Sequence, residues 1–187
     1  MASRRHVFIS HHHADDKAVT SLTKMLSRKG YEIRNSSIRA KPANRERLKK
    51  GLVADSTIKR LLRMKMSWAS TAIVVIGKNT ANRPWVDWEI NQAKRQGKRI
   101  IGVYERGGTE NDKPAALEQY GSAIVNWNAE SIISAVEGAN TFQTPEGDDR
   151  QPVVVSRIWW KFSGGILRVW GFGPDQAARS RLIAAMG

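Results

Sequence analysis

An aromatic and an acidic side chain stand one helical turn apart in the segment RPWVDWEI, residues 83–90. Pro84 favours the first turn of a helix, and in a helix that begins there Trp85 and Glu89 share one face. A glutamate near the start of a helix is common because the helix dipole stabilises it. The second interpretation is a site in which Glu89 acts on a ligand that stacks against Trp85. The choice depends on the elements that position this segment.

The segments around this pair alternate between the residue patterns of strands and helices. Strands are predicted at residues 6–10, 31–36, 71–77, 99–105 and 122–127, and helices at 15–30, 55–68, 86–98, 114–121 and 129–138. The run TAIVVIG at 71–77 is typical of a strand buried on both faces of a parallel sheet. Strands and helices that alternate in this way predict an α/β fold, namely a flavodoxin-like, doubly wound parallel sheet of five strands.

Polar segments follow the first three predicted strands at their carboxyl ends, where ligands bind in an open parallel sheet. These segments are SHHHADD, NSSIRAKPANR and KNTANRPWVDWE. The candidates for hydrogen bonds to a ligand, chosen by this position, are Ser10, His11, Asn35 and Ser36. Trp85 and Glu89 start the helix after the third strand and therefore belong to the same edge of the sheet.

Three consecutive histidines, His11 to His13, raise the question of a metal site. A metal ion needs ligands that converge on it, and neighbouring side chains mostly diverge, so we predict no metal. Two interpretations stay open. One is a polar turn whose Asp15 and Asp16 favour the helix N-terminus, and the other is a contact between His11 or His12 and an anionic ligand.

The chain of 187 residues carries a formal charge of +14, which points to an anionic partner. Ten Lys or Arg stand against two acids between Arg39 and Lys65. A solvated helix face, phosphate attraction and subunit association all fit this basic stretch. Nucleic acid is disfavoured, because neither stacking aromatics nor a known motif accompanies the charges. Neither GxxxxGK[ST] nor GxGxxG occurs, which disfavours an ATPase and a Rossmann dehydrogenase.

The chain contains no cysteine, which excludes disulfides, thiolate metal sites and a cysteine nucleophile. The first residues lack the apolar run of a signal peptide. No segment reaches the run of about 18 apolar residues that a membrane-spanning helix needs. We therefore expect a cytoplasmic protein.

The composition changes after residue 139. The segment 140–152 has the Pro, Gly and acid content of a linker, so residues 1–139 are predicted as the α/β domain and residues 153–187 as a Trp-rich C-terminal extension. The segment DQAARSRLIAAM, near the end of the extension, has the pattern of a helix. One interpretation of the residues before it is a β-hairpin that turns at 163–165 and packs its tryptophans on the domain. The other is an interfacial or self-association element, because Trp beside Arg and Lys suits a membrane surface.

Several segments, in the right order, resemble a TIR domain, and within it the bacterial TIR-like group of Thoeris-type antiphage defence. They are FISHHHADD, YEIRNSSI, and RPWVDWEI with the following QGKRIIGVYE. The resemblance covers roughly residues 6–139. It implies cleavage of NAD⁺ at the nicotinamide–ribose bond, with NAD⁺ as substrate and no cofactor. The catalytic glutamate of the family falls on Glu89, and its partner tryptophan falls on Trp85.

The resemblance also implies a product and partners. Depending on the acceptor of the ribosyl group, the product is ADP-ribose, a cyclic ADP-ribose isomer or a conjugate, and it would switch on a separate effector protein. Enzymes of the family often need assembly, so a homo-oligomer is expected. Two other functions stay open. One is a non-catalytic TIR adaptor that binds partners through the basic loop, and the other is a nucleoside deoxyribosyltransferase-like enzyme, which also uses a glutamate on an α/β sheet.

Overall fold

The computed structural model describes residues 4–10, 16–35, 54–78, 80–151, 159–162 and 165–168. The chain divides into two compact units, Met1–Gln151 and Pro152–Gly187. The elements of the first unit are β1 (Arg4–Ser10), α1 (Asp16–Arg28), β2 (Glu32–Asn35), α3 (Asp55–Ser67), β3 (Thr71–Ile76), η2 (Thr80–Asn82), α4 (Pro84–Arg95), β4 (Arg99–Tyr104), η3 (Glu110–Asp112), α5 (Ala115–Tyr120), β5 (Ala123–Val125) and α6 (Ala129–Glu137).

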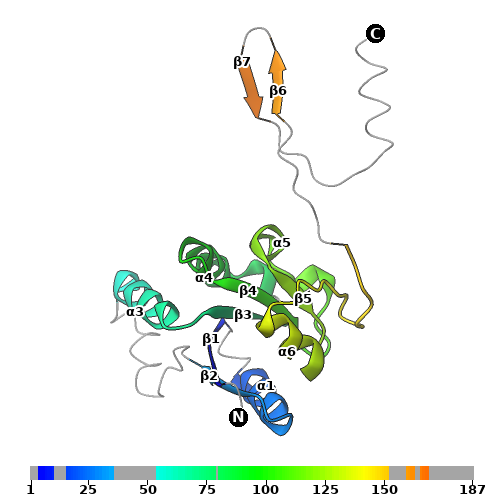
Figure 1. The fold of residues 1–187 in the computed structure, drawn as a ribbon. Coiled ribbons are helices and arrows are strands. Elements are labelled where there is room, and N and C mark those ends of the chain that lie inside the picture. The colour runs from blue at the N-terminus through cyan, green and yellow to red at the C-terminus, as the bar shows by residue number, and fades with distance from the viewer. Residues whose placement is uncertain are drawn as a thin grey trace. The chain divides into compact units, whose positions relative to one another are not determined.

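The five strands form one parallel sheet in the order β2-β1-β3-β4-β5 (Figure 1). The predicted fold, a doubly wound five-stranded α/β sheet, is confirmed. The chain leaves β1 toward one edge to make β2 and then returns to β3 on the other side of β1. The carboxyl ends of β1 and β3 therefore flank the point where the strand order reverses, which is the place for a ligand in such sheets.

Side chains of β1 alternate between two hydrophobic cores because successive residues of a strand point to opposite faces. Val7 and Ile9 belong to the core beneath α1 and α6. Phe8 belongs to the core beneath α3, α4 and α5. Ser10 lies two residues after Phe8, so its side chain points toward the same face as Phe8, which is the face covered by α4.

Helix α4 is held against this second core by one apolar stripe. Val86, Ile90 and Ala93 are buried at the i, i+4 and i+7 positions, which lie on one side of a helix. This stripe fixes the rotation of the helix about its axis. Trp85 and Glu89 each precede a member of the stripe by one residue, so they lie along its border.

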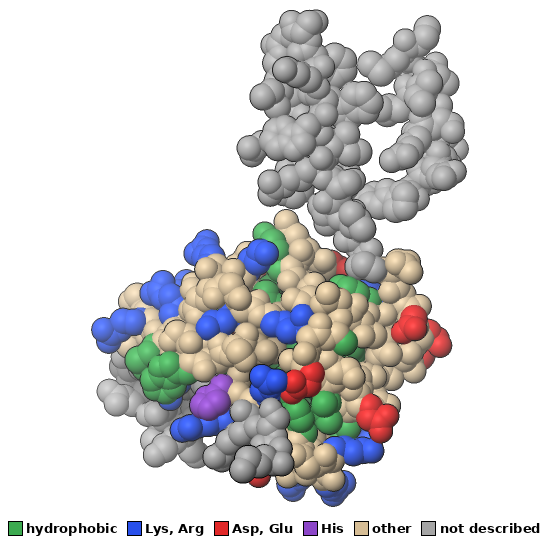
Figure 2. Space-filling view, viewed as in Figure 1, with side chains coloured by type: hydrophobic (Ala, Val, Ile, Leu, Met, Phe, Trp, Pro, Cys, Tyr) green, Lys and Arg blue, Asp and Glu red, His purple; other side chains and the backbone are tan. Residues whose placement is uncertain are grey.

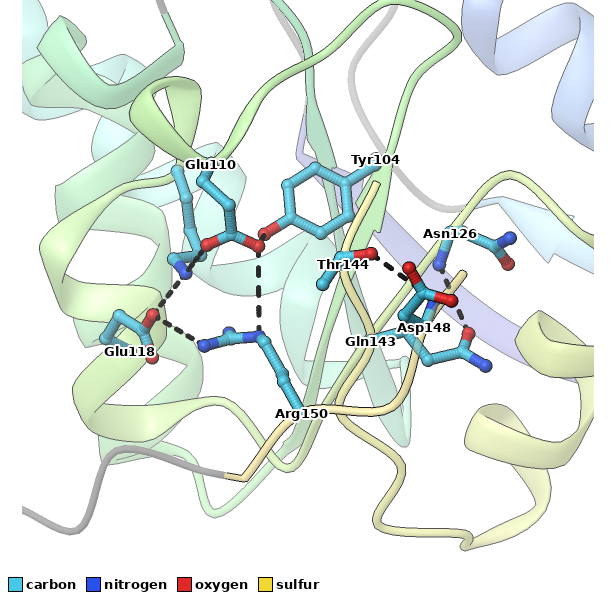
Figure 3. Close-up of polar contacts among 9 residues, drawn as sticks. Tyr104, Glu110, Glu118, Asn126, Gln143, Thr144, Asp148 and Arg150 are labelled. Atoms are coloured by element: carbon cyan, nitrogen blue, oxygen red, sulfur yellow. Dashed lines mark hydrogen bonds and ion pairs between the residues drawn. The ribbon is translucent and has the colours of Figure 1, made fainter. Parts of the chain in front are cut away.

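The segment at 140–152, predicted as a linker, instead lies along the first unit as far as Arg150. Phe142 makes a parallel bridge with Ile124 of β5 and packs against the second core. Arg150 Nη1 donates a hydrogen bond to Glu118 Oε1 over 3.1 Å, and Arg150 Nε lies 3.8 Å from Glu110 Oε1 (Figure 3). One aromatic and one cationic side chain thus hold a segment whose composition is otherwise that of a loop.

A tight turn allows this segment to fold back on itself. Gln143 bridges Asp149 in antiparallel fashion, and the Asp148 N–H donates to Thr144 Oγ1 over 3.3 Å (Figure 3). Gly147 has a φ of 105°, a conformation that side-chain-bearing residues rarely adopt. The Pro and Gly content that predicts a linker therefore builds this turn.

The second unit contains an antiparallel pair, β6 (Trp159–Phe162) and β7 (Gly165–Arg168), in which Phe162 pairs with Gly165. The two strands lie in the segment for which a hairpin is predicted, and residues 163–164 between them lie outside the described residues. The packing of its tryptophans stays a prediction, and the helix expected after it lies outside the described residues. Among the residues that the structure describes, no helix combines the length and apolar character needed to cross a membrane.

Basic side chains dominate the face of the first unit shown in Figure 2, with acidic ones gathered toward α6. Helix α3 carries part of this charge and buries Leu62 and Met66. Leu61, Met64 and Trp68 of the same region stay exposed. The helix therefore docks on the sheet through a narrow stripe and presents a mixed basic and apolar surface to solvent.

Candidate active site

The carboxyl end of β1 meets α4 at a hydrogen bond between Ser10 and Glu89. Ser10 Oγ donates to Glu89 Oε2, and Ser10 is only 3% exposed. The alternation of β1 explains why the hydroxyl reaches this face, and the buried stripe of α4 explains why the carboxyl group faces the sheet end. Two groups that lie 79 positions apart in sequence thus meet beside the reversal point of the sheet.

The carboxyl group of Glu89 has lost most of its contact with water. Burial raises the pKa of Glu89 to about 7, and the hydrogen bond from Ser10 opposes this rise. Glu89 as a whole residue is of intermediate exposure. A carboxyl group with a pKa near neutrality is a frequent mark of a functional site.

Trp85 and Trp88 precede Glu89 on α4, and a lysine of α3 meets their rings. Trp85 is 38% exposed, and its ring meets that of Trp88 edge to face, with centroids 6.0 Å apart and planes at 71°. Trp88 packs partly against the second core. Lys59 of α3 places its Nζ 5.6 Å from the Trp85 ring centroid and 6.0 Å from that of Trp88, within cation–π range. An exposed aromatic ring with a cation beside it therefore lies one helical turn before Glu89 on the same helix.

The turn from β3 into α4 is fixed by a buried threonine. The Gly77 N–H donates to Thr80 Oγ1 over 2.9 Å, and the Arg83 N–H donates to the Thr80 carbonyl over 3.3 Å. Arg83 is the N-cap residue and Pro84 occupies the first turn of the helix. Thr80 thus positions the start of α4 and, through it, Glu89. The sequence offers only a polar loop here, so this role was missed.

Of the three other candidates for hydrogen bonds to a ligand, the structure describes Asn35 alone. Asn35 pairs in register with Val7, three residues before Ser10, a separation of about 10 Å along a strand. His11 and Ser36 lie outside the described residues. In the part of the chain that the structure describes, no group of three potential metal ligands occurs. The absence of a metal stays a prediction, because the histidine run is not included.

Lys59 was also missed as a specific neighbour of the site. The sequence places it in the basic stretch between Arg39 and Lys65, but a charge run does not say which cation meets which ring. The contact depends on how α3 packs beside α4. Its only sequence signal is that Lys59 follows Ile58, a residue packed against the second core.

The fold and the Trp–Glu helix start agree with the TIR-like domain that the sequence predicts. A family model described as "Thoeris protein ThsB, TIR-like domain" matches residues 8–110, more than half of the chain. The chain therefore belongs to the ThsB TIR-like domain family of Thoeris proteins, and the resemblance found in the sequence is confirmed. The matched range includes Ser10, Lys59, Trp85 and Glu89. No curated protein matches the chain.

Several solved structures are similar to this chain at low identity. The CMP N-glycosidase BcmB of Clostridium botulinum has 15% identity and a TM-score of 0.42, over 71% of this chain and 98% of its own. The RPS4 and RRS1 TIR domain heterodimer has 17% identity and a TM-score of 0.44, over 72% of this chain and 92% of its own. A prokaryotic SEFIR domain has 18% identity and a TM-score of 0.41, over 71% of this chain and 94% of its own. Overlaps of this extent do not bear on function.

Proposed function

We propose that the chain cleaves the bond between nicotinamide and ribose in NAD⁺, with Glu89 as the catalytic carboxylate. The observation that carries this proposal is the desolvated carboxyl group of Glu89, held by Ser10 at the reversal point of the sheet. Membership of the Thoeris TIR-like family supports it. NAD⁺ acts here as substrate, so no separate cofactor is needed.

The reaction suits a site with one carboxylate. Nicotinamide leaves as a neutral molecule from a cationic glycoside, so no general acid has to protonate it. The demand on the protein is to stabilise positive charge that develops on the ribose in an oxocarbenium-like transition state. An ionised Glu89 does this strongly, because a charge removed from water interacts more strongly with a charge that forms beside it.

The neighbours of Glu89 fit the rest of the substrate. The exposed ring of Trp85 offers a surface on which a flat ring can stack, and Lys59 supplies positive charge near a pyrophosphate. We further propose that the product is derived from ADP-ribose and serves as a signal to a separate effector in antiphage defence. Homo-oligomers and a cytoplasmic location belong to the same proposal.

The test is nicotinamide release from NAD⁺ by the purified full chain, measured by mass spectrometry. Glu89→Gln keeps the shape of the side chain but not its charge, and we expect it to lower release at least 100-fold, the scale on which transition-state charge stabilisation acts. Glu130→Gln is the matched control, because Glu130 is an exposed carboxylate that pairs only with Lys29 in the described structure. We expect it to act as wild type.

Unchanged release by Glu89→Gln would contradict the mechanism. Failure of the wild-type chain to release nicotinamide, both when purified and in phage-infected cells that express it, would contradict the function itself. Infected cells are included because activity in a defence protein can require a trigger.

A further inference from the structure

A concave site lies on the opposite face of the sheet from Glu89. A groove of about 360 Å³ runs between α1 and the loops that follow β4 and β5, and we call it the α1 groove. Its volume is in the range of small-molecule sites. It is lined by Lys17, Ala18, Ser21, Lys24, Met25, Arg28, Glu105, Arg106 and Trp127.

One wall of the α1 groove is a basic stripe along α1. Lys17, Lys24 and Arg28, with Ser21 among them, follow each other at steps of four, three and four residues, the spacing of one helix face. All four side chains are exposed. The buried residues Val19, Leu22 and Leu26 hold the other side of the helix on the first core. The rotation of α1 is therefore fixed with its cations toward the groove.

The opposite wall adds another cation and an aromatic ring. Arg106 is exposed, and Trp127 is partly buried against the first core while it also lines the groove. Glu105 is the one acid of the lining, and its Oε2 lies 2.6 Å from where a Cβ on Gly77 would stand. That carboxylate therefore extends over the end of β3. With four cations against this one acid in its lining, the groove is positively charged.

The α1 groove is separate from the site of Glu89. Its lining residues on α1 and after β5 pack on the first core, beneath α1 and α6. Glu89 and Ser10 face the second core side, beneath α3, α4 and α5. The sheet lies between them, and neither Ser10 nor any residue of α4 lines the groove.

We propose that the α1 groove binds a nucleotide that carries a di- or triphosphate. The cations of α1 span the 12 residues from Lys17 to Arg28, about 16 Å of helix, which is long enough for a phosphate chain and its sugar. Lysine and arginine on two walls suit phosphate oxygens. Trp127 and Met25 offer the apolar contact that a base needs, since aromatic side chains stack on bases. This site goes beyond the proposed reaction and does not depend on it.

The probes are ATP, inorganic triphosphate and adenosine, titrated calorimetrically into the full-length chain. Lys24→Glu/Arg28→Glu reverses two charges of the stripe, and we expect it to weaken ATP binding at least tenfold. Arg60→Glu/Arg63→Glu is the matched control, because it makes the same charge change on exposed residues of α3. We expect it to change ATP affinity less than twofold. Inorganic triphosphate and adenosine should each bind at least tenfold more weakly than ATP.

Two further measurements locate the site. Acetylation footprinting should show that ATP protects Lys17 and Lys24 but not Lys94 of α4. Arg106→Glu should weaken ATP binding as the α1 variant does, and its circular dichroism spectrum shows whether it is folded. Both groove variants should release nicotinamide from NAD⁺ at the wild-type rate if the proposed reaction holds, and a failure of that reaction leaves ATP binding unaffected.

Four results would overturn the proposal. They are no binding of ATP, equal loss of binding in the α3 control variant, triphosphate binding as tight as that of ATP, and ATP protection of Lys59 in place of the α1 lysines. The second would mean attraction to overall charge, and the last would assign the nucleotide to the Glu89 site.

Discussion

The two faces of the sheet carry their charged groups in opposite ways. On the α4 face the carboxyl group of Glu89 is removed from water and bonded to Ser10. On the α1 face four cations line a groove with their side chains exposed. Burial strongly changes the properties of one group on the first face, whereas the second adds several solvated charges that each interact weakly.

The difference begins in the alternation of β1. Ile9 points to the α1 face and Ser10 to the α4 face, so a shift of one residue in this strand would exchange the two. Both sites lie at the same carboxyl edge of the sheet. Because successive residues of a strand point to opposite faces, the position of a residue in the strand decides which of the two sites its side chain can reach. Nearness to a strand end is therefore insufficient evidence that two polar residues share a site.

Matched core truncations on the two faces should give the largest effects and separate stability from activity. Leu22 and Ile90 are both buried, one on α1 and the other on α4. We expect Leu22→Ala and Ile90→Ala each to lower the free energy of unfolding by about 2–5 kcal/mol in urea titrations. Only Ile90→Ala should also lower nicotinamide release under conditions where both variants are folded. Equal loss of release in Leu22→Ala would mean that the two faces are not independent.

The buried carboxyl group should make stability depend on pH. The pKa of Glu89 is raised in the folded chain, so its contribution to stability is fully present below its unfolded value, near 4.5, and is lost as pH rises through about 7. Glu89→Gln lacks this loss. We expect it to be more stable than wild type at pH 8 by on the order of 3 kcal/mol, and nearly equal at pH 4.5, in urea unfolding. A difference that does not change with pH would contradict the burial of this carboxyl group.

Ser10 should set the pH at which Glu89 acts. If the ionised carboxylate is the catalytic form, kcat/KM for NAD⁺ falls as pH drops below about 7. The hydrogen bond from Ser10 lowers the pKa of Glu89, so Ser10→Ala raises this pKa and moves the acid limb to higher pH, by about one pH unit. Ser67→Ala, which removes a hydroxyl bonded to the Met64 carbonyl on α3, should leave the profile in place. A limb that moves to lower pH in Ser10→Ala would contradict the assignment.

Salt should distinguish the two faces by a smaller effect. Exposed charges are screened by ions, and buried ones much less. Raising the ionic strength from about 0.05 to about 0.3 M should weaken ATP binding at the α1 groove several-fold. Calorimetry measures this change in affinity. The acid limb of the kcat/KM profile should shift little over the same range. A clear shift of the acid limb with salt would indicate that Glu89 is solvated.

Local pattern was enough to predict most of the sheet. The run at 71–77 contains the buried strand β3, and Pro84 begins α4 as expected, because burial on both faces and a fixed proline φ are properties of a few neighbouring residues. The spacing of four residues correctly predicted that Trp85 and Glu89 lie on one side of that helix. Strand-end position selected Ser10, which does meet Glu89.

Contacts between distant elements could not be predicted in this way. Asn35 was chosen by the same rule as Ser10. In the register of the sheet, however, Asn35 pairs with Val7, three residues before Ser10. The segment around Phe142 has the composition of a linker, and only its fit against β5 and the two acids near Arg150 makes it part of the domain. Lys59 meets Trp85 only because two helices pack side by side. Each of these depends on where another part of the chain lies.

A carboxyl group with a pKa of about 7 is a proton reservoir at the pH of most cells. Near pH 7 about half of the molecules hold a proton on Glu89. Any ligand that brings positive charge beside Glu89 favours the ionised form and expels that proton into the buffer. Binding of such a ligand would therefore acidify an unbuffered solution, and the heat of binding would change with the ionisation enthalpy of the buffer.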